Sequence, residues 1–234
     1  MPEDQNTTDS QYFARRRVSA ETYHNYALPF YLKSRLPTDK NAVIVDFGCG
    51  MGRMLKTLKA EGYTNVHGID IEDEAIQFCR TAGLNASKEL PTEIKGKVAL
   101  VIMNHVLEHL KKDQMISALK GIRDLLAPDG KLFVAVPNAQ SPTGAYWRYE
   151  DFTHEYLFTS GSLYHVLICA GFSKIDFIDM DCTEGFGLLK KSIRKTLLAL
   201  YRLNYKFWNK VTSSGTQPTS EDIFSFEIKA IARK

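Results

Sequence analysis

The 234-residue chain lacks the segments that mark exported and membrane-spanning proteins. Residues 1–10 are polar and acidic, unlike a secretory signal, and no apolar run approaches the roughly 20 residues of a membrane span. The four cysteines are scattered and form no Cys-x-x-Cys pair; they are Cys49, Cys79, Cys169 and Cys182. Such a set favours reduced thiols over a disulfide framework. We therefore expect a soluble, cytoplasmic protein.

Acidic residues are absent from one late segment, residues 188–211, which contains seven basic residues. The whole chain has a net charge of +3, so removing these seven positive charges leaves −4 for the remainder. The basic character therefore belongs to one segment and does not predict a nucleic-acid-binding surface.

Within this segment, basic residues recur four positions apart, as at Lys190 and Arg194, with apolar residues such as Leu189 and Ile193 between them. The pattern predicts an amphipathic helix over residues 188–211. Two interpretations remain open. Either the helix packs its leucines on the domain and leaves its charges in water, or its Lys190–Lys210 stretch makes a peripheral contact with the inner face of an anionic membrane.

From residue 43 onward, short β-branched runs alternate with helical patterns. Strands are expected at residues 43–47, 66–70, 98–103, 131–136, 173–180 and 223–232. Helices are expected at residues 51–62, 73–83, 113–127, 160–170 and 188–211, with one or two more within residues 12–36. The helix at 113–127 should stop at a turn formed by residues 128–130. The alternation implies a parallel sheet with right-handed crossovers.

The length and composition suit one globular domain, because 44% of the residues are hydrophobic and 24% are charged. Residues 1–42 are expected to form a helical cover of the same domain that residues 43–234 build. Residues 137–160 form a long insert at the carboxyl edge of the sheet, where loops commonly build substrate pockets.

Three alternate glycines, Gly48, Gly50 and Gly52, follow the first expected strand. Glycine permits positive φ and a close approach of the backbone to a ligand, and ligands bind at the carboxyl ends of such strands. Asp70 ends the second strand, 20 residues after Gly50, where its carboxylate can accept both hydroxyls of a ribose. A nicotinamide site is disfavoured, because its third glycine would fall at Arg53 and no Tyr-x-x-x-Lys pair is present.

The run from Val45 to Gly52, with Asp46 two residues ahead of Gly48, resembles motif I of class I S-adenosylmethionine-dependent methyltransferases. Three further motifs of that family follow in its order, at residues 67–71, 101–110 and 126–132. The resemblance implies a Rossmann-like α/β fold with a doubly wound, mostly parallel, seven-stranded sheet whose final strand is antiparallel. The chain departs from the family at residues 97–100, where the usual acid at the start of strand four is missing.

The resemblance also implies how S-adenosylmethionine would be held. The glycine backbone would meet its aminocarboxypropyl tail, Asp70 would bind the ribose, and Ile71 would pack on the adenine. Asn104 and His105 would lie beside the sulfonium, and residues 86–87 would line the adenine edge. The expected cofactor-binding residues are Asp46, Gly48, Gly50, Gly52, Asp70, Ile71, Ala86, Ser87, Asn104 and His105.

Residues 148–159 read Arg-Tyr-x-Asp-Phe-Thr-His and then Phe-Thr, and they resemble methyltransferases of bacterial cell-surface polysaccharide and sugar modification. This likeness implies O-methylation of a sugar or glycan intermediate. Two alternatives remain open. One is a small-molecule methyltransferase of the quinone-biosynthesis type, whose branch shares the Leu-Glu-His-Leu run at residues 107–110; the other is a non-catalytic module that binds the cofactor.

A sugar hydroxyl needs a base when its proton leaves, and histidine has a suitable pKa. His154 is the first choice, with Asp151 close enough to orient it if that stretch is helical. His109 and His105 are alternatives, since both follow strand four on the cofactor side. The residues expected to bind the acceptor are Tyr146 and Arg148. No complete set of metal ligands is visible, so no metal site is assigned, and the sequence defines neither the acceptor nor the oligomeric state.

Overall fold

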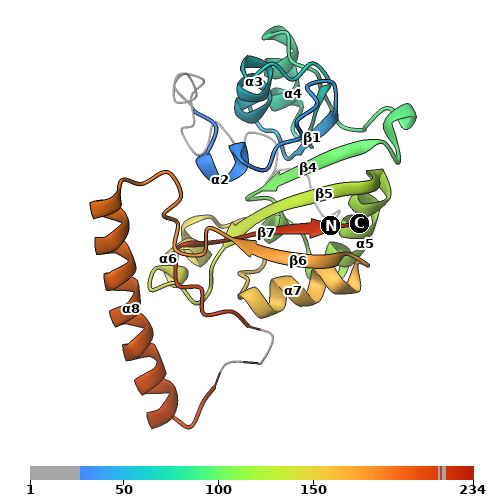
Figure 1. Cartoon of the computed structure of the whole chain (residues 1–234). Helices are drawn as coiled ribbons and strands as arrows, with labels where there is room; N and C mark the ends of the chain where they lie inside the picture. Colours follow the sequence, from blue (N-terminus) through green and yellow to red (C-terminus); the bar gives the residue numbers. More distant parts are fainter. Residues whose placement is uncertain (1–26, 216, 218–219) are drawn as a thin grey trace.

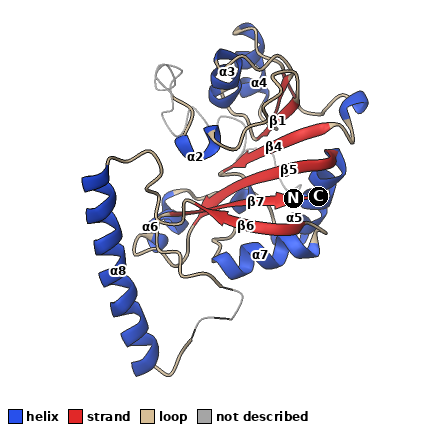
Figure 2. Ribbon diagram, viewed as in Figure 1, coloured by secondary structure: helices blue, strands red, loops and turns tan. Residues whose placement is uncertain are grey.

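The computed structural model describes residues 27–215, 217 and 220–234. A seven-stranded sheet forms its centre, in the order β3-β2-β1-β4-β5-β7-β6 (Figures 1 and 2). The strands are β1 (Val43–Phe47), β2 (Val66–Ile69), β3 (Ala86–Ser87), β4 (Val98–Asn104), β5 (Leu126–Pro137), β6 (Ser173–Ile178) and β7 (Glu227–Arg233). The α-helices are α2 (Phe30–Lys33), α3 (Arg53–Ala60), α4 (Asp73–Thr81), α5 (Lys112–Leu125), α6 (Gly144–Glu150), α7 (Ser160–Cys169) and α8 (Leu188–Val211). The described residues also form two short 3-10 helices, η2 (Thr92–Ile94) and η3 (Leu107–His109).

The strand directions confirm the expected doubly wound sheet. β1 pairs in parallel with β2 and with β4, and β4 pairs in parallel with β5. The final strand, β7, lies between β5 and β6 and runs antiparallel to both. The carboxyl ends of β1, β2, β4 and β5 therefore meet at one edge of the sheet, which is where such folds bind ligands.

Neighbouring residues of the central strands point to opposite faces of the sheet and build two separate cores. Ile44 belongs to the core that contains Leu32 of α2 and Leu58 of α3, whereas Val45 belongs to the core that contains Leu119 of α5 and Leu163 of α7. Both faces of β1 and β4 are thus covered by helices, which explains why these strands are nearly continuous apolar runs.

Strand β5 begins earlier than the sequence predicts. The expected turn at residues 128–130 lies inside the strand as a bulge, since the pairing of β4 with β5 shifts register between Val98 and Leu100. A side chain at Gly130 would place its Cβ 2.6 Å from the carbonyl oxygen of Val98, so the bulge requires glycine there.

Strand β7 begins later than predicted, at Glu227 rather than Ile223. The carbonyls of Ile223 and Ser225 accept hydrogen bonds from the side-chain amide of Asn138, both at 2.8 Å. These residues are therefore bonded to the start of the insert and not to a neighbouring strand.

The remaining predicted helices and strands are present, and α8 has the predicted bounds, residues 188–211. Of the helices expected within residues 12–36, α2 falls in the described part, and the residues before position 27 lie outside it. None of the described helices combines the length and the apolar character that crossing a membrane requires.

Candidate active site

The glycine loop after β1 adopts backbone angles that favour glycine. Gly48, Gly50 and Gly52 have φ values of 80°, 50° and 74°. A Cβ at position 48 would collide with the side chain of Val106, and one at position 52 would lie 2.6 Å from that of Leu84. The loop needs glycine both for its torsion angles and for its close approach to neighbouring segments.

Asp70 ties this loop to the end of β2. Its Oδ2 accepts a hydrogen bond from the amide of Gly50 at 2.7 Å, and its Oδ1 accepts one from the amide of Glu72 at 3.0 Å. A carboxylate offers about four acceptor positions, so Asp70 keeps capacity for the two hydroxyls of a ligand. Burial raises the pKa of the neighbouring Asp46 carboxyl to about 7, and the negative charge of Asp70 adds to this rise.

A cavity of about 540 Å³ opens between the glycine loop, the end of β2 and the turn after β4. Its size falls within the roughly 300–1,000 Å³ of small-ligand sites. The structure brings together seven of the ten expected cofactor-binding residues in its lining, and these are Asp46, Gly48, Gly50, Asp70, Ile71, Asn104 and His105.

The other three expected residues do not line this cavity. Gly52 packs against Cys79 of α4 and against Leu84, while Ala86 is buried in β3 and Ser87 donates its hydroxyl to the carbonyl of Glu89. The lining also includes residues that the sequence did not single out, among them Met51, Glu72, Val106, Leu110 and Thr153. The first four adjoin recognised motif residues or fall within a motif, whereas Thr153 comes from the insert.

His105 is held as a cation at the turn after β4. Its Nδ1 lies 3.2 Å from Oε1 of Glu108, and its Nε2 lies 3.0 Å from Oε2 of Glu227. Burial by itself lowers the pKa of His105, but the hydrogen bonds and charges of the two carboxylates outweigh burial and raise it to about 10. An imidazole that already holds both protons at neutral pH is disfavoured as a general base.

A buried lysine holds Glu227 in place. The Nζ of Lys229 lies 3.1 Å from Glu227 and 3.1 Å from Asp179, and all three side chains are at most 7% exposed. Breaking a buried pair of this kind leaves an uncompensated charge, which makes the arrangement costly to disturb. The ion pairs therefore fix the carboxylate that in turn fixes His105.

His109 lines the cavity and is oriented by the insert. Its Nδ1 lies 2.8 Å from Oγ1 of Thr153, whose hydroxyl donates to Oδ1 of Asp151 at 2.7 Å. Because Thr153 gives its proton to Asp151, its oxygen accepts from Nδ1–H of His109, and the neutral ring then carries its lone pair on Nε2. Burial lowers the pKa of His109, and the charge of His154 lowers it further, against the opposing effects of Glu108 and Asp151. The neutral ring is favoured.

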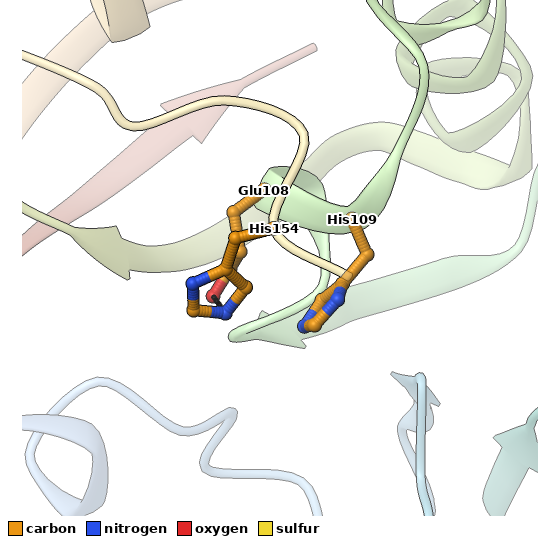
Figure 3. Close-up of side chains that lie close together, drawn as sticks. All are labelled: Glu108, His109 and His154. Carbon is orange, nitrogen blue, oxygen red and sulfur yellow. Dashed lines mark ion pairs between the residues drawn. The ribbon is translucent and has the colours of Figure 1, made fainter. Parts of the chain in front are cut away.

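His154 lies beside His109 (Figure 3). It is buried and is not part of the cavity lining. Its Nδ1 is 2.7 Å from the carbonyl oxygen of Trp147, and its ring meets that of His109 edge to face at 4.7 Å between centroids. The stretch that joins Asp151 to His154 is not helical, since α6 ends at Glu150. Asp151 lies 3.8 Å from Nε2 of His154 and forms its short hydrogen bonds with Thr153 instead.

The two residues expected to bind the acceptor lie outside the cavity wall. Tyr146 is 55% exposed on α6 and packs edge to face on Trp147. The guanidinium of Arg148 donates to the carbonyl oxygen of His154, so it fixes the fold of the insert.

Glu108, His109 and His154 each offer one possible metal-ligand atom, and these atoms lie within 4.8 Å of one another (Figure 3). Oε1 of Glu108 is 3.9 Å from Nε2 of His154, which is wider than the roughly 3.4 Å between ligands of a tetrahedral site with bonds of about 2.1 Å. Binding a metal ion would require these side chains to move. As they stand, they form a cluster of acid and base groups in which Glu108 and His154 are buried and His109 is partly exposed.

We expect Gly48→Ala to destabilise the protein more than Gly62→Ala does. Both glycines have left-handed φ, 80° and 91°, so each alanine costs about 1–2 kcal/mol of backbone strain. A Cβ at position 62 meets nothing within 4 Å, whereas one at position 48 collides with Val106. Urea unfolding should show an additional loss of about 1–3 kcal/mol for Gly48→Ala, partly recovered when Val106→Ala is added. Equal losses in the two single variants would contradict the crowding at Gly48.

Comparison with known proteins gives a family and a set of similar folds. The chain matches the model of the family described as methyltransferase domain over residues 16–176. No curated protein matches it. One similar solved structure is a SAM-dependent methyltransferase from Archaeoglobus fulgidus, which is 21% identical with a TM-score of 0.62 over 95% of this chain and 97% of that chain.

Two further solved structures are similar in fold. A possible histamine N-methyltransferase from Thermotoga maritima is 15% identical, with a TM-score of 0.60 over 95% of this chain and 96% of that chain. Phosphoethanolamine N-methyltransferase 2 from Haemonchus contortus, in complex with S-adenosyl-L-methionine, is 17% identical, with a TM-score of 0.61 over 96% of this chain and 59% of that chain. Since the family match spans more than half of the sequence, the chain belongs to the methyltransferase domain family, and its fold is that of S-adenosylmethionine-dependent methyltransferases.

Proposed function

We propose that the protein methylates a hydroxyl of a sugar, or of a glycan intermediate of a cell-surface polysaccharide. Methyl transfer, with S-adenosylmethionine as the cofactor, follows from the family. The hydroxyl acceptor is supported by the hydrogen-bonded chain from Asp151 through Thr153 to His109. This chain carries the proposal, because it gives the cavity wall a neutral imidazole of defined tautomer, as proton removal from a hydroxyl requires.

The residues around the cavity suit the cofactor. Gly48 and Gly50 line the cavity and carry no side chains, so the loop presents bare backbone to a ligand's tail. Asp70 keeps acceptor capacity for ribose hydroxyls, and Ile71, which is 75% exposed, offers an apolar surface for the adenine. When bound, the cofactor supplies a methyl group on a positively charged sulfur.

His109 is proposed as the general base of the reaction. It accepts the proton of the acceptor hydroxyl at Nε2, while Thr153 holds the proton on Nδ1 and Asp151 orients Thr153. The carboxylates of Asp151 and Glu108 then stabilise the imidazolium. Methyl transfer is an in-line displacement, so the same contacts contribute by fixing where the base stands relative to the acceptor.

The insert supplies exposed aromatic rings for an acceptor. Tyr149 is 80% exposed and Phe152 is 97% exposed, and Phe152 immediately precedes Thr153 of the cavity lining. Aromatic faces left in water commonly mark a binding surface, and they suit the apolar face of a sugar ring. The same rings would also stack on an aromatic acceptor, so the quinone-type alternative shares this support.

We expect Asp70→Ala to weaken binding of S-adenosylhomocysteine by roughly tenfold to a hundredfold, the value of hydrogen bonds to a charged group. Calorimetric titration measures this, with NAD as the ligand control. Asp73→Ala is the matched variant, because Asp73 is exposed on α4, pairs with Lys88 and does not line the cavity. Undiminished binding in Asp70→Ala, or binding of NAD by the native protein, would contradict the cofactor site.

We expect His109→Asn to lower turnover by roughly a hundredfold or more, which is the usual loss when a general base is removed. Thr153→Val should lower turnover less, since it frees the ring without removing it. Affinity for S-adenosylhomocysteine should stay within about threefold in both variants, because neither residue is assigned to the cofactor. Turnover is measured as the initial rate of methyl transfer to the acceptor that the product analysis identifies.

The control for this test is His165→Asn, an exposed histidine on α7 away from the cavity. If His109→Asn keeps full turnover and His154→Asn loses turnover, His154 and not His109 would be the base. Turnover that a chelator abolishes and Zn²⁺ restores would instead assign Glu108, His109 and His154 to a metal site.

We expect methylated products from sugar nucleotides or glycans and none from hydroxylated aromatics. The purified protein is incubated with radiolabelled S-adenosylmethionine and each acceptor set, and the products are identified by mass spectrometry. Phe152→Ala should raise KM for the productive acceptor by about tenfold, if its ring stacks on that acceptor. Transfer only to aromatics would favour the quinone-type alternative, and transfer to neither set would favour the non-catalytic module.

A further inference from the structure

Helix α8 turns its apolar side away from the protein. Figure 1 shows the helix at the outside of the molecule, apart from the sheet, and none of its 24 residues, all of them described, is buried. The side toward the body is half-buried and is marked by Lys191, Arg194, Leu198, Tyr201 and Tyr205. A surface helix usually presents its apolar stripe to the core, so α8 has the opposite orientation.

The opposite side of α8 is mostly apolar, with the exposed Asn204 as a polar residue within it. At about 100° per residue, the large exposed side chains form one stripe that runs from opposite the half-buried residues round to the edge beside Tyr201, and this stripe is here called the outward face. Its main members are between 51% and 77% exposed, and they are Leu189, Ile193, Leu197, Leu200, Phe207 and Trp208. Soluble monomers rarely leave such a contiguous surface in water.

Contacts with the body fix this orientation. The guanidinium of Arg194 donates to the carbonyl oxygen of Asp181 at 2.7 Å. Tyr201 and Tyr205 pack against Phe224, with ring centroids 5.3 and 5.0 Å apart. Rotating the helix to bury the outward face would break these contacts.

Positive charge accompanies the outward face. Lys190 and Lys210, both exposed, flank it on either side, and α8 contains seven basic residues and no acidic one. A helix with Leu, Phe and Trp on one face, and Lys and Arg elsewhere, is the type that lies in the headgroup region of anionic membranes. We propose that α8 docks the protein on an anionic membrane surface through its outward face.

A second copy of the chain suits the outward face less well. Two α8 helices packed along it would bring the lysines that flank it close together, and neither helix has an acidic residue to pair with them. Anionic headgroups neutralise the same lysines, each of which adds to binding.

The position of α8 in the topology gives this docking a consequence for the enzyme. α8 follows β6, which runs in the direction of β5, and the chain then returns to the start of the antiparallel β7. Both connections of α8 therefore leave from the carboxyl edge of the parallel strands, where the cavity opens. Docking through α8 brings that edge to the membrane, where an acceptor carried on a lipid would be found.

The test measures binding of the full chain to vesicles, with no need for turnover. We expect the protein to sediment with vesicles that contain phosphatidylglycerol, and to remain in solution with pure phosphatidylcholine. Trp147→Phe leaves Trp208 as the sole tryptophan, and its emission should shift to the blue when anionic vesicles are added. Both signals should weaken as the salt concentration rises.

Two variants separate the apolar and the basic contributions. Ile193→Ser/Leu200→Ser/Phe207→Ser should weaken partitioning by roughly a hundredfold or more. Lys190→Gln/Lys195→Gln/Lys210→Gln should weaken it by roughly a hundredfold. The matched charge control is Lys56→Gln/Lys95→Gln/Lys120→Gln, whose lysines are exposed on other parts of the chain and should leave binding unchanged.

Binding of S-adenosylhomocysteine should be retained in every one of these variants, which shows that they fold. No sedimentation of the native protein with anionic vesicles at low salt would overturn the proposal. A second result would also overturn it: analytical ultracentrifugation shows a dimer, the Ile193→Ser/Leu200→Ser/Phe207→Ser variant is monomeric, and the native dimer does not bind vesicles. Both of these results concern α8 alone, so they would leave the proposed methyltransferase site unaffected.

Discussion

The candidate active site depends on one fully buried carboxylate, that of Glu108. Its Oε1 binds His105 in the turn after β4, at 3.2 Å, and its main-chain carbonyl accepts hydrogen bonds from the amides of Glu155 and Tyr156, at 2.8 and 3.2 Å. A single residue of η3 thereby fastens the insert to the end of the strand that borders the cavity. Because a buried charge tolerates little displacement, this fastening sets where His109, the next residue, stands.

The same carboxylate begins a chain of charged groups that crosses the sheet edge, in which His105 is partly exposed to the cavity and the others are buried. His105 connects Glu108 to Glu227, and Lys229 connects Glu227 to Asp179 after β6. His105 has a left-handed backbone, φ 55°, which costs of order 1–3 kcal/mol in a residue with a side chain and persists only when its surroundings hold it. The ion-pair network holds His105 in this conformation. The cost of the strained backbone and of the buried charges is thus offset by a cavity wall that is rigid and pre-organised.

Most of the fold could be predicted from the sequence, because strands, helices and the glycine loop leave local patterns. Asp70 was found by its distance along the chain from Gly50, and both lie in the cavity. The base that we propose could not be chosen this way, because the sequence does not distinguish His109 from His154, whereas the fold places His109 in the cavity wall and buries His154. Thr153 lies within the run at residues 148–154 that resembles sugar-modifying methyltransferases, but its role had no signal, because a hydroxyl becomes informative only when its donor and acceptor are known.

The sequence of helix α8 does not determine which way its apolar face points. Its periodicity predicts that leucines share one face, but a period says nothing about whether that face meets the protein or the solvent. Residues outside the helix determine the orientation. The ring of Phe224 packs against those of Tyr201 and Tyr205, and Arg202 donates to the carbonyl oxygen of Asp222 at 3.1 Å, so aromatic and basic side chains occupy much of the side that leucines would fill in an ordinary surface helix. The apolar stripe is then left outward by the packing of the body itself. A helix with Tyr and Arg on its inner side, and Leu, Phe and Trp on its outer side, presents an apolar surface that is suited to contact with another partner.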